Sequence, residues 1–422
     1  MTVRSRASSR FAHLSRCPSG SRLVALRIAL RTPKGTPEGA HLSRRLSGSR
    51  RGPWRGHPEG DPEGDPGGGD SLGIPEASRP SILDLDLPGL EQVMAAWDQP
   101  AYRARQIWQA VYQRGIVDAE QATDLPFEVR RRLHDTFEFR GFSEVARRTS
   151  TDGHTTKWLL SDRTGGATVE AVLMTYDRRR TACISTQAGC AMGCTFCATG
   201  QMGFLRNLTS GEIVEQVLRL GRDQPLTNIV FMGMGEPFHN YQASLAAVDR
   251  LTDPMGMRFG ARRITISTVG IVPMIRRFAE ERRQVNLAVS LHAATDEVRD
   301  RLVPINRRYP LAALMEACRE YIESTHRRLT IEWALIQDVN DGPDQAAALV
   351  ERLRGMLCHV NLIPLNPTAG YPGAAPDSRR AEAFRARLKS SGIACTLRVR
   401  RGIDIQAGCG QLATEVAAPG QG

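Results

Sequence analysis

Hydrophobic residues recur at three- and four-residue spacing between residue 81 and about residue 139. Leu90, Met94 and Trp97 follow this spacing, and similar groups come after them. This repeat places apolar side chains on one face of an α-helix. The pattern predicts a small bundle of short helices with its own core. A strand-like region at Thr156–Leu160 and Thr168–Thr175 follows it.

Beyond residue 180 two kinds of segment alternate. Apolar runs rich in β-branched residues predict strands at Thr181–Thr186, Asn228–Met232, Arg263–Thr268, Val285–Leu291, Leu329–Ile336 and His359–Pro364. Helical periodicity lies between most of them, at Gly211–Leu220, Tyr241–Leu251, Val272–Glu280, Leu311–Ser324 and Asp344–Leu357. The alternation predicts an α/β fold with a parallel sheet, either open or curled into a partial (β/α)6 barrel. In such folds the catalytic groups gather at the carboxyl ends of the strands.

Residues 1–78 lack a sustained apolar pattern and are rich in Arg, Ser, Pro and Gly. Such a composition buries too little apolar surface to offset the entropy of ordering, so a disordered tail is expected. The net charge of +11 belongs to this tail, because residues 1–60 hold 13 Lys and Arg against 2 acidic residues. An RNA-attracting arm and a transit peptide remain open, and a dispensable extension is favoured. The expected organisation is a tail at 1–78, a helical domain at 79–145, a catalytic domain at 146–415 and a C-terminal tail at 416–422.

The cellular setting follows from apolar runs and cysteine usage. No apolar run approaches the length of a membrane-spanning helix, so no membrane association is expected. Nine cysteines, most of them single in apolar surroundings, do not resemble a secreted disulfide framework. They fit a reducing cytoplasm, where thiols serve metals or catalysis.

Three cysteines follow the first predicted strand at spacings of four and three: Cys190, Cys194 and Cys197. They can hold three irons of one cuboidal [4Fe–4S] cluster and leave the fourth iron without a protein ligand. An enzyme that cleaves S-adenosylmethionine (SAM) needs such an open iron. The amino and carboxylate groups of SAM bind it, and electron transfer then yields a 5′-deoxyadenosyl radical. A zinc site prefers four protein ligands, and a ferredoxin needs a fourth nearby thiolate, so the radical SAM interpretation is favoured.

Small and polar residues stand where the other predicted strands end. Gly235 and Glu236 follow the second strand, where a glycine lets a ligand approach the backbone and a carboxylate can hold the SAM ammonium. The corresponding residues of the third, fourth and sixth strands are Ser267, then Ser290, Leu291 and His292, then Asn366. Each alone is more often a helix cap or turn residue. Together they predict a SAM site at the carboxyl edge of the sheet.

Two cysteines differ from the apolar ones. Cys183 lies within the first strand, and Cys409 lies between two glycines in a polar loop near the C-terminus. Free cysteines in apolar surroundings, such as Cys318 and Cys395, are usually inert core residues. The Cys409 thiol is instead expected to be exposed and available for chemistry.

From about residue 81 to residue 412 the sequence resembles the RlmN/Cfr family of radical SAM RNA adenine methyltransferases. The resemblance rests on ordered motifs at Val169–Leu173, Cys183–Cys197, Gly203–Leu208, Met232–Pro237, Ser290–His292 and Gly408–Leu412. The segment Tyr102–Val117, with Thr123–Pro126, resembles the N-terminal domain of that family. The family resemblance implies a radical SAM barrel as the catalytic domain.

The resemblance also implies the reaction. Family members methylate adenine C2 in the peptidyl-transferase region of 23S rRNA and, in tRNAs, C2 of the adenine 3′ to the anticodon; the Cfr branch methylates C8. By resemblance, Cys409 takes a methyl group from one SAM as a thioether. A second SAM supplies the radical that removes a hydrogen from this methyl, and the carbon radical adds to the base. Cys183 then forms a transient disulfide with Cys409, which releases the product, and Glu170 matches the proton acceptor.

The implied partners are rRNA and tRNA substrates and an electron donor such as flavodoxin or ferredoxin, with the enzyme acting as a cytoplasmic monomer. The target base must lie in a loop or be flipped out. Arginines that could bind phosphates, or simply form a solvated charged face, are Arg178–Arg180, Arg206, Arg262 and Arg263. A Cfr-like C8 methyltransferase and a non-catalytic iron–sulfur RNA-binding protein remain as alternatives.

Overall fold

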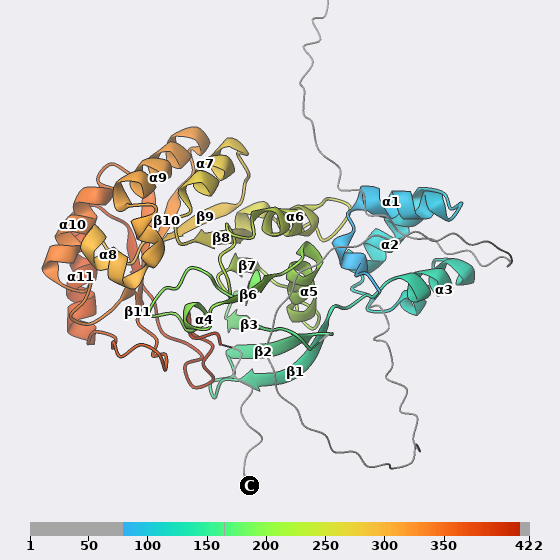
Figure 1. The fold of residues 1–422 in the computed structure, drawn as a ribbon, viewed down its shortest axis with the longest axis horizontal. Coiled ribbons are helices and arrows are strands. Elements are labelled where there is room, and N and C mark those ends of the chain that lie inside the picture. Colours follow the sequence, from blue (N-terminus) through green and yellow to red (C-terminus); the bar gives the residue numbers. More distant parts are fainter. Residues whose placement is uncertain (1–78, 164, 414–422) are drawn as a thin grey trace, which may run out of the picture. The chain divides into compact units, whose positions relative to one another are not determined.

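The computed structural model describes residues 79–163 and 165–413, so the predicted tails at 1–78 and 416–422 lie outside the described residues. The described part begins with helices where the apolar spacing predicts them (Figure 1). These are η1 (Ile82–Asp84), α1 (Leu87–Ala96), α2 (Tyr102–Tyr112), η2 (Ala119–Gln121) and α3 (Phe127–Thr136). None of the helices in the described residues is long and apolar enough to span a bilayer.

Local sequence explains where the first helix begins and how this region joins the rest. The Asp86 side chain accepts a hydrogen bond from the Gly89 amide at 2.8 Å and so caps α1. The Asp84 carboxylate accepts a hydrogen bond from the Gly211 amide at 2.8 Å, and Arg250 donates to the Asp84 carbonyl at 2.8 Å. A side chain at position 211 would lie within 3 Å of Leu83 and Asp84, so the glycine permits this close approach.

One ten-stranded sheet organises the remainder of the described chain. Its antiparallel part consists of β1 (Phe142–Thr149), β2 (Thr155–Asp162) and β3 (Thr168–Tyr176), with β3 pairing to β4 (Arg179–Cys183). From β4 onward all pairs are parallel, through β7 (Asn228–Phe231), β8 (Ile264–Thr268), β9 (Asn286–Ser290), β10 (Leu329–Leu335), β11 (Cys358–Pro364) and β12 (Cys395–Leu397). Because β1 and β12 are the two edges, the sheet is open, and the predicted α/β fold with a partial barrel is confirmed.

Helices follow the parallel strands and lie outside them (Figure 1). They are α5 (Ser210–Leu220), α6 (Tyr241–Thr252), η3 (Ala261–Arg263), α7 (Val272–Glu280), α8 (Asp296–Leu302), η4 (Pro304–Arg307), α9 (Leu311–Thr325), α10 (Pro343–Leu353) and α11 (Ser378–Ser390). A capping box between Thr209 and Glu212 begins α5. Strand residues such as Ile229, Ile266 and Leu287 are fully buried, as expected for strands covered on both faces.

The structure corrects the first predicted strand. The prediction extended this strand to Thr186, but β4 ends at Cys183, and a separate short strand β5 (Gln187–Gly189) pairs antiparallel with β6 (Phe204–Asn207). The Ser185 backbone bonds to a side chain and not to a strand: its amide donates to Gln216 Oε1 at 2.8 Å, and its carbonyl accepts from Gln216 Nε2 at 2.9 Å, so the ladder ends there. The cysteine loop therefore starts from this two-stranded unit and not directly from the large sheet.

Candidate active site

The three cysteines of the predicted cluster motif lie in the loop between β5 and α4 (Ala198–Gln201). The Cys190 amide donates to the Gly203 carbonyl at 2.7 Å, and the Cys197 amide donates to the Cys194 carbonyl at 3.2 Å. A side chain at Gly200 would lie 2.9 Å from the Cys194 carbonyl oxygen, so the turn closes tightly on itself. Burial is the main cause of the raised pKa values of Cys190 and Cys194, and the nearby Cys197 thiol raises both further.

The surroundings of these thiols suit an iron–sulfur cluster. Burial raises the pKa of Cys190 to about 12 and also raises the pKa values of Cys194 and Cys197, so metal binding is needed to keep all three as thiolates. Backbone amides donate to two of the sulfurs, from Met192 to Cys190 and from Gly200 to Cys197. In the described part of the chain no three His, Cys, Asp or Glu side chains converge as ligands of a single metal ion. A cuboidal cluster has a different requirement, since each thiolate binds its own iron.

Gly235 and Glu236 form a tight turn after β7. Gly235 has a φ of 95°, and a Cβ there would lie 2.5 Å from the Cβ of Gln187, so a larger residue does not fit. The buried Glu236 carboxylate accepts hydrogen bonds from the Val269 amide at 2.8 Å and the Phe238 amide at 2.9 Å. Burial raises the pKa of Glu236 to about 7. The position matches the prediction for a carboxylate at the end of the second parallel strand.

The ends of β8 and β9 bring two predicted residues together. The hydroxyls of Ser267 and Ser290 are 3.3 Å apart. Leu291 is buried, and its amide donates to the Glu332 carbonyl at 3.0 Å. Two neighbouring strands therefore present small polar groups side by side, as the sequence predicts.

His292 lies at the predicted strand end, but the protein already uses its ring. The Nδ1 atom accepts a hydrogen bond from the Ala334 amide at 3.0 Å, and the ring packs edge-on against Phe196 of the cysteine loop, with centroids 4.9 Å apart. Burial lowers the pKa of His292 to about 3, so the ring is neutral. Its backbone φ of 62° makes the turn at this strand end. Of the ring nitrogens only Nε2 is left for a ligand, and the His292 carbonyl already accepts a hydrogen bond from Asn340 at 2.7 Å.

Arg299 holds this region and was missed by the sequence reasoning. It is fully buried in α8 and donates to the carbonyls of Val269 at 2.6 Å and Leu291 at 3.0 Å. It also donates to the Ser290 carbonyl at 3.2 Å. Burial lowers the pKa of Arg299 to about 10, while nearby Cys194 opposes this. An arginine in a helix next to other charged residues carries no sequence signal for burial.

The C-terminal loop brings Cys409 to the cysteine motif. The Ala198 amide donates to the Gly410 carbonyl at 2.8 Å, and the Thr199 hydroxyl donates to the Leu412 carbonyl at 2.6 Å. The Asn366 amide nitrogen donates to the Cys409 carbonyl at 3.0 Å. The Oδ1 of Asn366 is buried and has no hydrogen-bond partner in the described part of the chain. This acceptor is available to a ligand with N–H or O–H groups.

Cys183 and Cys409 line one cavity of about 440 Å³, although they are 226 positions apart in the sequence. The cavity lies among β3, β4, β7, β10, β11 and the segment 396–412. Cys409 is exposed to the cavity although protein surrounds it, and burial raises the pKa of its thiol. Burial also raises the pKa of Cys183, with a further contribution from Cys409. The predicted exposure of Cys409 is thus seen inside the fold.

Glu170 lies on β3 and is buried beside Lys157 of β2, with Nζ and Oε1 2.8 Å apart. Burial raises the pKa of Glu170, and the Lys157 ammonium opposes that rise. The sequence reasoning missed Lys157, since a single lysine in a strand usually points to solvent. Glu332 was also missed: it is buried in β10, lines the same cavity and accepts a hydrogen bond from Asn361 at 2.9 Å.

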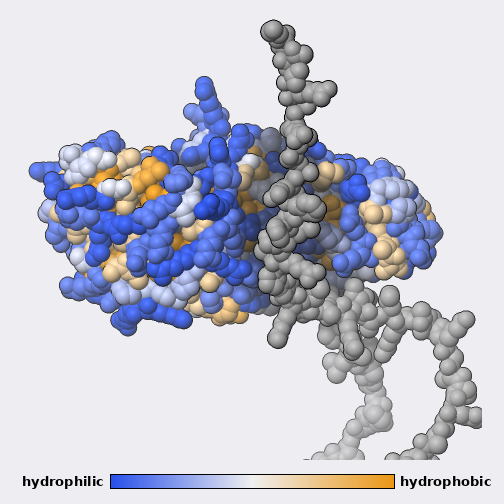
Figure 2. All heavy atoms as spheres, turned by 90° about the horizontal axis from the view of Figure 1, so that it is seen from above, coloured by the Kyte–Doolittle hydropathy of each residue, from blue (hydrophilic) through white to orange (hydrophobic). Residues whose placement is uncertain are grey.

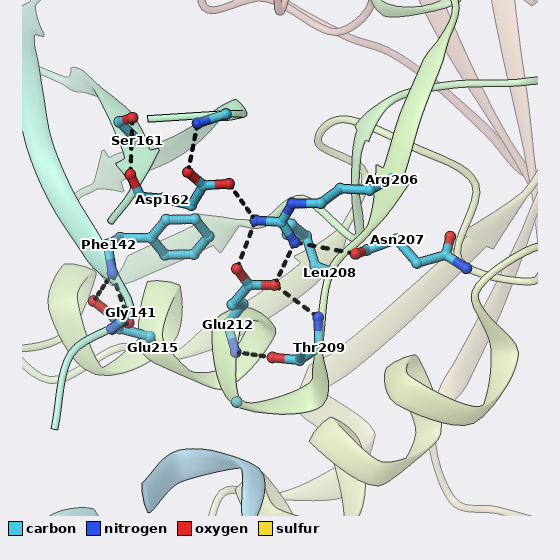
Figure 3. A network of polar contacts seen from close by, with 12 residues as sticks. Gly141, Phe142, Ser161, Asp162, Arg206, Asn207, Leu208, Thr209, Glu212 and Glu215 are labelled. Atoms are coloured by element: carbon cyan, nitrogen blue, oxygen red, sulfur yellow. Dashed lines mark hydrogen bonds and ion pairs between the residues drawn. The ribbon is translucent and has the colours of Figure 1, made fainter. Parts of the chain in front are cut away.

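The arginines considered for phosphate binding have different environments. Arg206 of β6 is held by two carboxylates, Asp162 at 3.0 Å and Glu212 at 2.7 Å, at the start of α5 (Figure 3). Arg179 lines the cavity and lies over the Tyr176 ring, with 4.3 Å to the centroid, and Arg401 lies over the same ring at 4.9 Å. Arg206 therefore has a structural ion pair, while Arg179 is open to the cavity.

The surface seen in Figure 2 is mainly hydrophilic, with hydrophobic residues in small separate groups. Large exposed hydrophobic side chains of the described residues include Phe204 and Leu205 near the cysteine loop and Val399 in the C-terminal segment. Scattered exposed apolar residues are normal for a folded protein. The cavity that contains Cys183 and Cys409 is also lined by charged side chains, among them Arg179 and Glu332.

Comparison with protein families gives two matches. Residues 184–350 match the radical SAM superfamily. This range includes the cysteine loop and the ends of β7, β8 and β9. Residues 81–139 match the N-terminal domain of ribosomal RNA large subunit methyltransferases. This range covers η1 to α3.

Individual relatives match over most of their length. The dual-specificity RNA methyltransferase RlmN 1 of Myxococcus xanthus is 47% identical over 348 residues, covering 81% of this chain and 97% of the relative. The probable dual-specificity RNA methyltransferase RlmN of Chloroflexus aurantiacus is 46% identical, covering 80% and 94%. The crystal structure of a radical SAM methyltransferase from Sphaerobacter thermophilus is 49% identical, with a TM-score of 0.78 over 80% of this chain and 100% of that chain.

Proposed function

Because the chain belongs to the RlmN family of radical SAM RNA methyltransferases, we propose that it methylates adenine C2 in two kinds of RNA. The proposed targets are one adenine in the peptidyl-transferase region of 23S rRNA and the adenine 3′ to the anticodon in tRNAs. The words "dual-specificity RNA methyltransferase" in the names of the relatives support two RNA classes. The enzyme has a [4Fe–4S] cluster and SAM as its cofactors.

One observation carries the proposal: Cys183 and Cys409 line one cavity, and the Cys409 loop is hydrogen-bonded to the residues just after Cys197. A non-catalytic iron–sulfur protein that only bound RNA would need neither thiol there. Two thiols at one cavity suit a covalent methyl carrier and a partner that releases the product.

The cofactors have a proposed place among these residues. Cys190, Cys194 and Cys197 would hold the cluster. The residues proposed to contact SAM are Gly235, Glu236, Ser267, Ser290, Leu291, His292 and Asn366. The partnerless Asn366 Oδ1 supports this assignment. When bound, these groups supply an electrophilic methyl group and a radical that removes hydrogen.

The chain's own side chains then carry the methyl group and the proton. Cys409 loses its thiol proton and accepts the methyl group on sulfur. After the methyl carbon has bonded to the base, the adduct gives up one electron, which the bound cluster would accept, and the Glu170 carboxylate accepts the proton from that base carbon. Cys183 gives up its thiol proton and its sulfur bonds to the Cys409 sulfur, while the bond from the Cys409 sulfur to the methylene carbon breaks and this carbon takes up a proton. The methylated adenine leaves, and a disulfide remains for later reduction.

Substrate and partners follow from the cavity and the fold. The Arg179 and Arg401 guanidiniums around Tyr176 suit an RNA phosphate or a stacked base at the cavity. The proposal includes a small electron-donor protein such as flavodoxin or ferredoxin, a monomeric state and a cytoplasmic location.

Nucleoside analysis tests the proposed product. The enzyme with reconstituted cluster is incubated anaerobically with SAM, a reductant and either 23S rRNA or tRNA, and the RNA is digested to nucleosides. The expected product is 2-methyladenosine from both RNAs. A yield of 8-methyladenosine would identify a Cfr-like enzyme, and the absence of any methylated base would favour an RNA-binding role.

A further inference from the structure

A buried ion pair lies beneath the loop that carries Cys409. Lys157 on β2 and Glu170 on β3 lie on adjacent antiparallel strands, and their charged atoms are 2.8 Å apart. The side chains are 9% and 4% exposed, so the pair has little contact with solvent. Water therefore screens this interaction weakly, and each charge depends on the other.

Each member of the pair also bonds to the loop, on opposite sides of Cys409. The Lys157 ammonium donates to the Gln406 carbonyl at 3.2 Å, ahead of Cys409 in the chain. The other carboxylate oxygen of Glu170 accepts from the Ala413 amide at 3.1 Å, beyond Cys409. One buried pair thus fixes both ends of the segment 406–413.

The backbone of this segment needs such support. Gln406 has a φ of 54°, a left-handed conformation that a residue with a side chain adopts at a cost. The segment contains two glycines, Gly408 and Gly410, whose freedom would let an unsupported loop take many conformations. A strained turn beside flexible residues stays in one conformation only where the surroundings hold it.

Stability alone is a weak reason for a buried ion pair. The free energy needed to remove two charges from water offsets the gain from their mutual attraction. A protein with an apolar pair of similar volume in their place is therefore often equally stable. A buried pair that specifies one conformation has a clearer benefit. Here the conformation specified is the one that presents the Cys409 thiol to the cavity.

We propose that Lys157 is a positioning residue for methyl transfer to Cys409. The inference rests on the proposed function. In that step the thiol proton leaves, the Cys409 sulfur bonds to the methyl carbon of SAM, the bond from this carbon to the SAM sulfonium breaks, and S-adenosylhomocysteine departs. Lys157 touches none of these atoms. It holds the loop so that the sulfur meets the methyl carbon in line, a placement on which such rates depend strongly.

The test follows the methylation of Cys409 by peptide mass spectrometry. Lys157→Met removes the charge and the donor at similar length, and the matched control Lys389→Met removes a lysine that is exposed on α11. With equal cluster content, Lys157→Met is expected to methylate Cys409 at least about tenfold more slowly than the wild type. Its SAM affinity stays within about threefold, since Lys157 makes no contact with the proposed SAM residues. Lys389→Met matches the wild type.

Two further variants separate positioning from charge balance. Lys157→Arg keeps the charge and donors, so much of the rate returns. Glu170→Gln keeps one acceptor oxygen and leaves the Lys157 donor to Gln406 in place, so Cys409 methylation is expected to fall less than in Lys157→Met, while RNA methylation is lost. A role limited to balancing the Glu170 charge predicts instead that Lys157→Met combined with Glu170→Gln restores Cys409 methylation, which would overturn the proposal.

The double variant also serves if Lys157→Met alone does not fold, because it leaves no unpaired buried charge. The proposal then expects the double variant to fold and still to methylate Cys409 at least about tenfold more slowly than Glu170→Gln. Wild-type methylation of Cys409 in any folded variant that has no cationic side chain at position 157 contradicts the proposal. Failure of the proposed function is a separate result, since the wild-type enzyme itself would then leave RNA without 2-methyladenosine.

Discussion

At the scale of single residues, Cys409 combines two properties that rarely occur together. Its thiol is exposed, yet it faces a cavity inside the fold and lies in a loop bonded to the cysteine motif. Other free cysteines, Cys318, Cys358 and Cys395, are buried in the core. The contrast in surroundings, rather than the residue type, separates a reactive thiol from a packing residue.

Replacing Cys409 tests its role as the methyl carrier. Cys409→Ala, with reconstituted cluster, is expected to lower the release of methylated adenine by roughly three orders of magnitude or more, because the carrier sulfur is gone. SAM binding is expected to remain, as the proposed SAM residues lie on other elements. Cys395→Ala, at a buried position on β12, serves as the control and should retain activity. Release at the wild-type rate by Cys409→Ala would remove the thioether from the mechanism.

At the scale of elements, the sequence predicted the parallel strands well, because apolar β-branched runs mark buried strands. It missed β1, α8, α11 and β12. Only the first residue of β1 is buried, α11 is rich in Arg and buries three residues, and β12 has three residues. An element that buries little has little apolar periodicity to detect. The predicted helix at 344–357 ends at Leu353, shortly before Gly355 with a φ of 73°.

The site shows the same division between what local pattern predicts and what packing decides. Strand order brings the ends of β7, β8, β9 and β11 to one edge, so the residues at those ends could be named from the sequence. Lys157, Arg299 and Gln187 act through contacts between distant segments. For example, the side-chain oxygen of Gln187 accepts a hydrogen bond from the Glu236 backbone amide at 2.8 Å. No single stretch of sequence contains that information.

A glycine comparison tests the turn after β7. Gly235→Ala is expected to weaken SAM binding by about tenfold or more, since the new methyl group would clash with Gln187 and displace Glu236. Gly355→Ala is a matched control, because Gly355 also has a positive φ but has no atom within 4 Å of the added Cβ. Equilibrium dialysis with labelled SAM measures both. Equal affinities for the two variants would mean that the Gly235 turn does not form part of the SAM site.

At the scale of the whole molecule, the excess positive charge and the family matches lie in different parts of the sequence. The net charge of +11 equals the excess of residues 1–60, so the rest of the chain is balanced. Matches to relatives cover about four-fifths of this chain and nearly all of the relatives, and the first family match begins at residue 81. Both family matches, at residues 81–139 and 184–350, lie after the basic segment.

Removal of residues 1–60 tests whether the basic segment contributes to catalysis. The shortened chain is expected to methylate saturating RNA within about twofold of the full chain. Its RNA affinity falls at low salt, and the dependence of affinity on salt becomes shallower, because fewer counterions are released from the RNA. Filter binding over a salt series and single-turnover methylation measure the two effects. A large loss of single-turnover rate would assign the segment a part in the reaction.

The central claim, that Cys409 passes its own methyl group to RNA, has a direct test with isotopes. The enzyme is loaded with SAM that carries a CD₃ group, freed of SAM, and mixed with RNA, reductant and unlabelled SAM for one turnover. The mechanism predicts a product methyl group with two deuterium atoms, because the third is removed before the carbon bonds to adenine. A product methyl group without deuterium, formed while Cys409 keeps its label, would contradict the account.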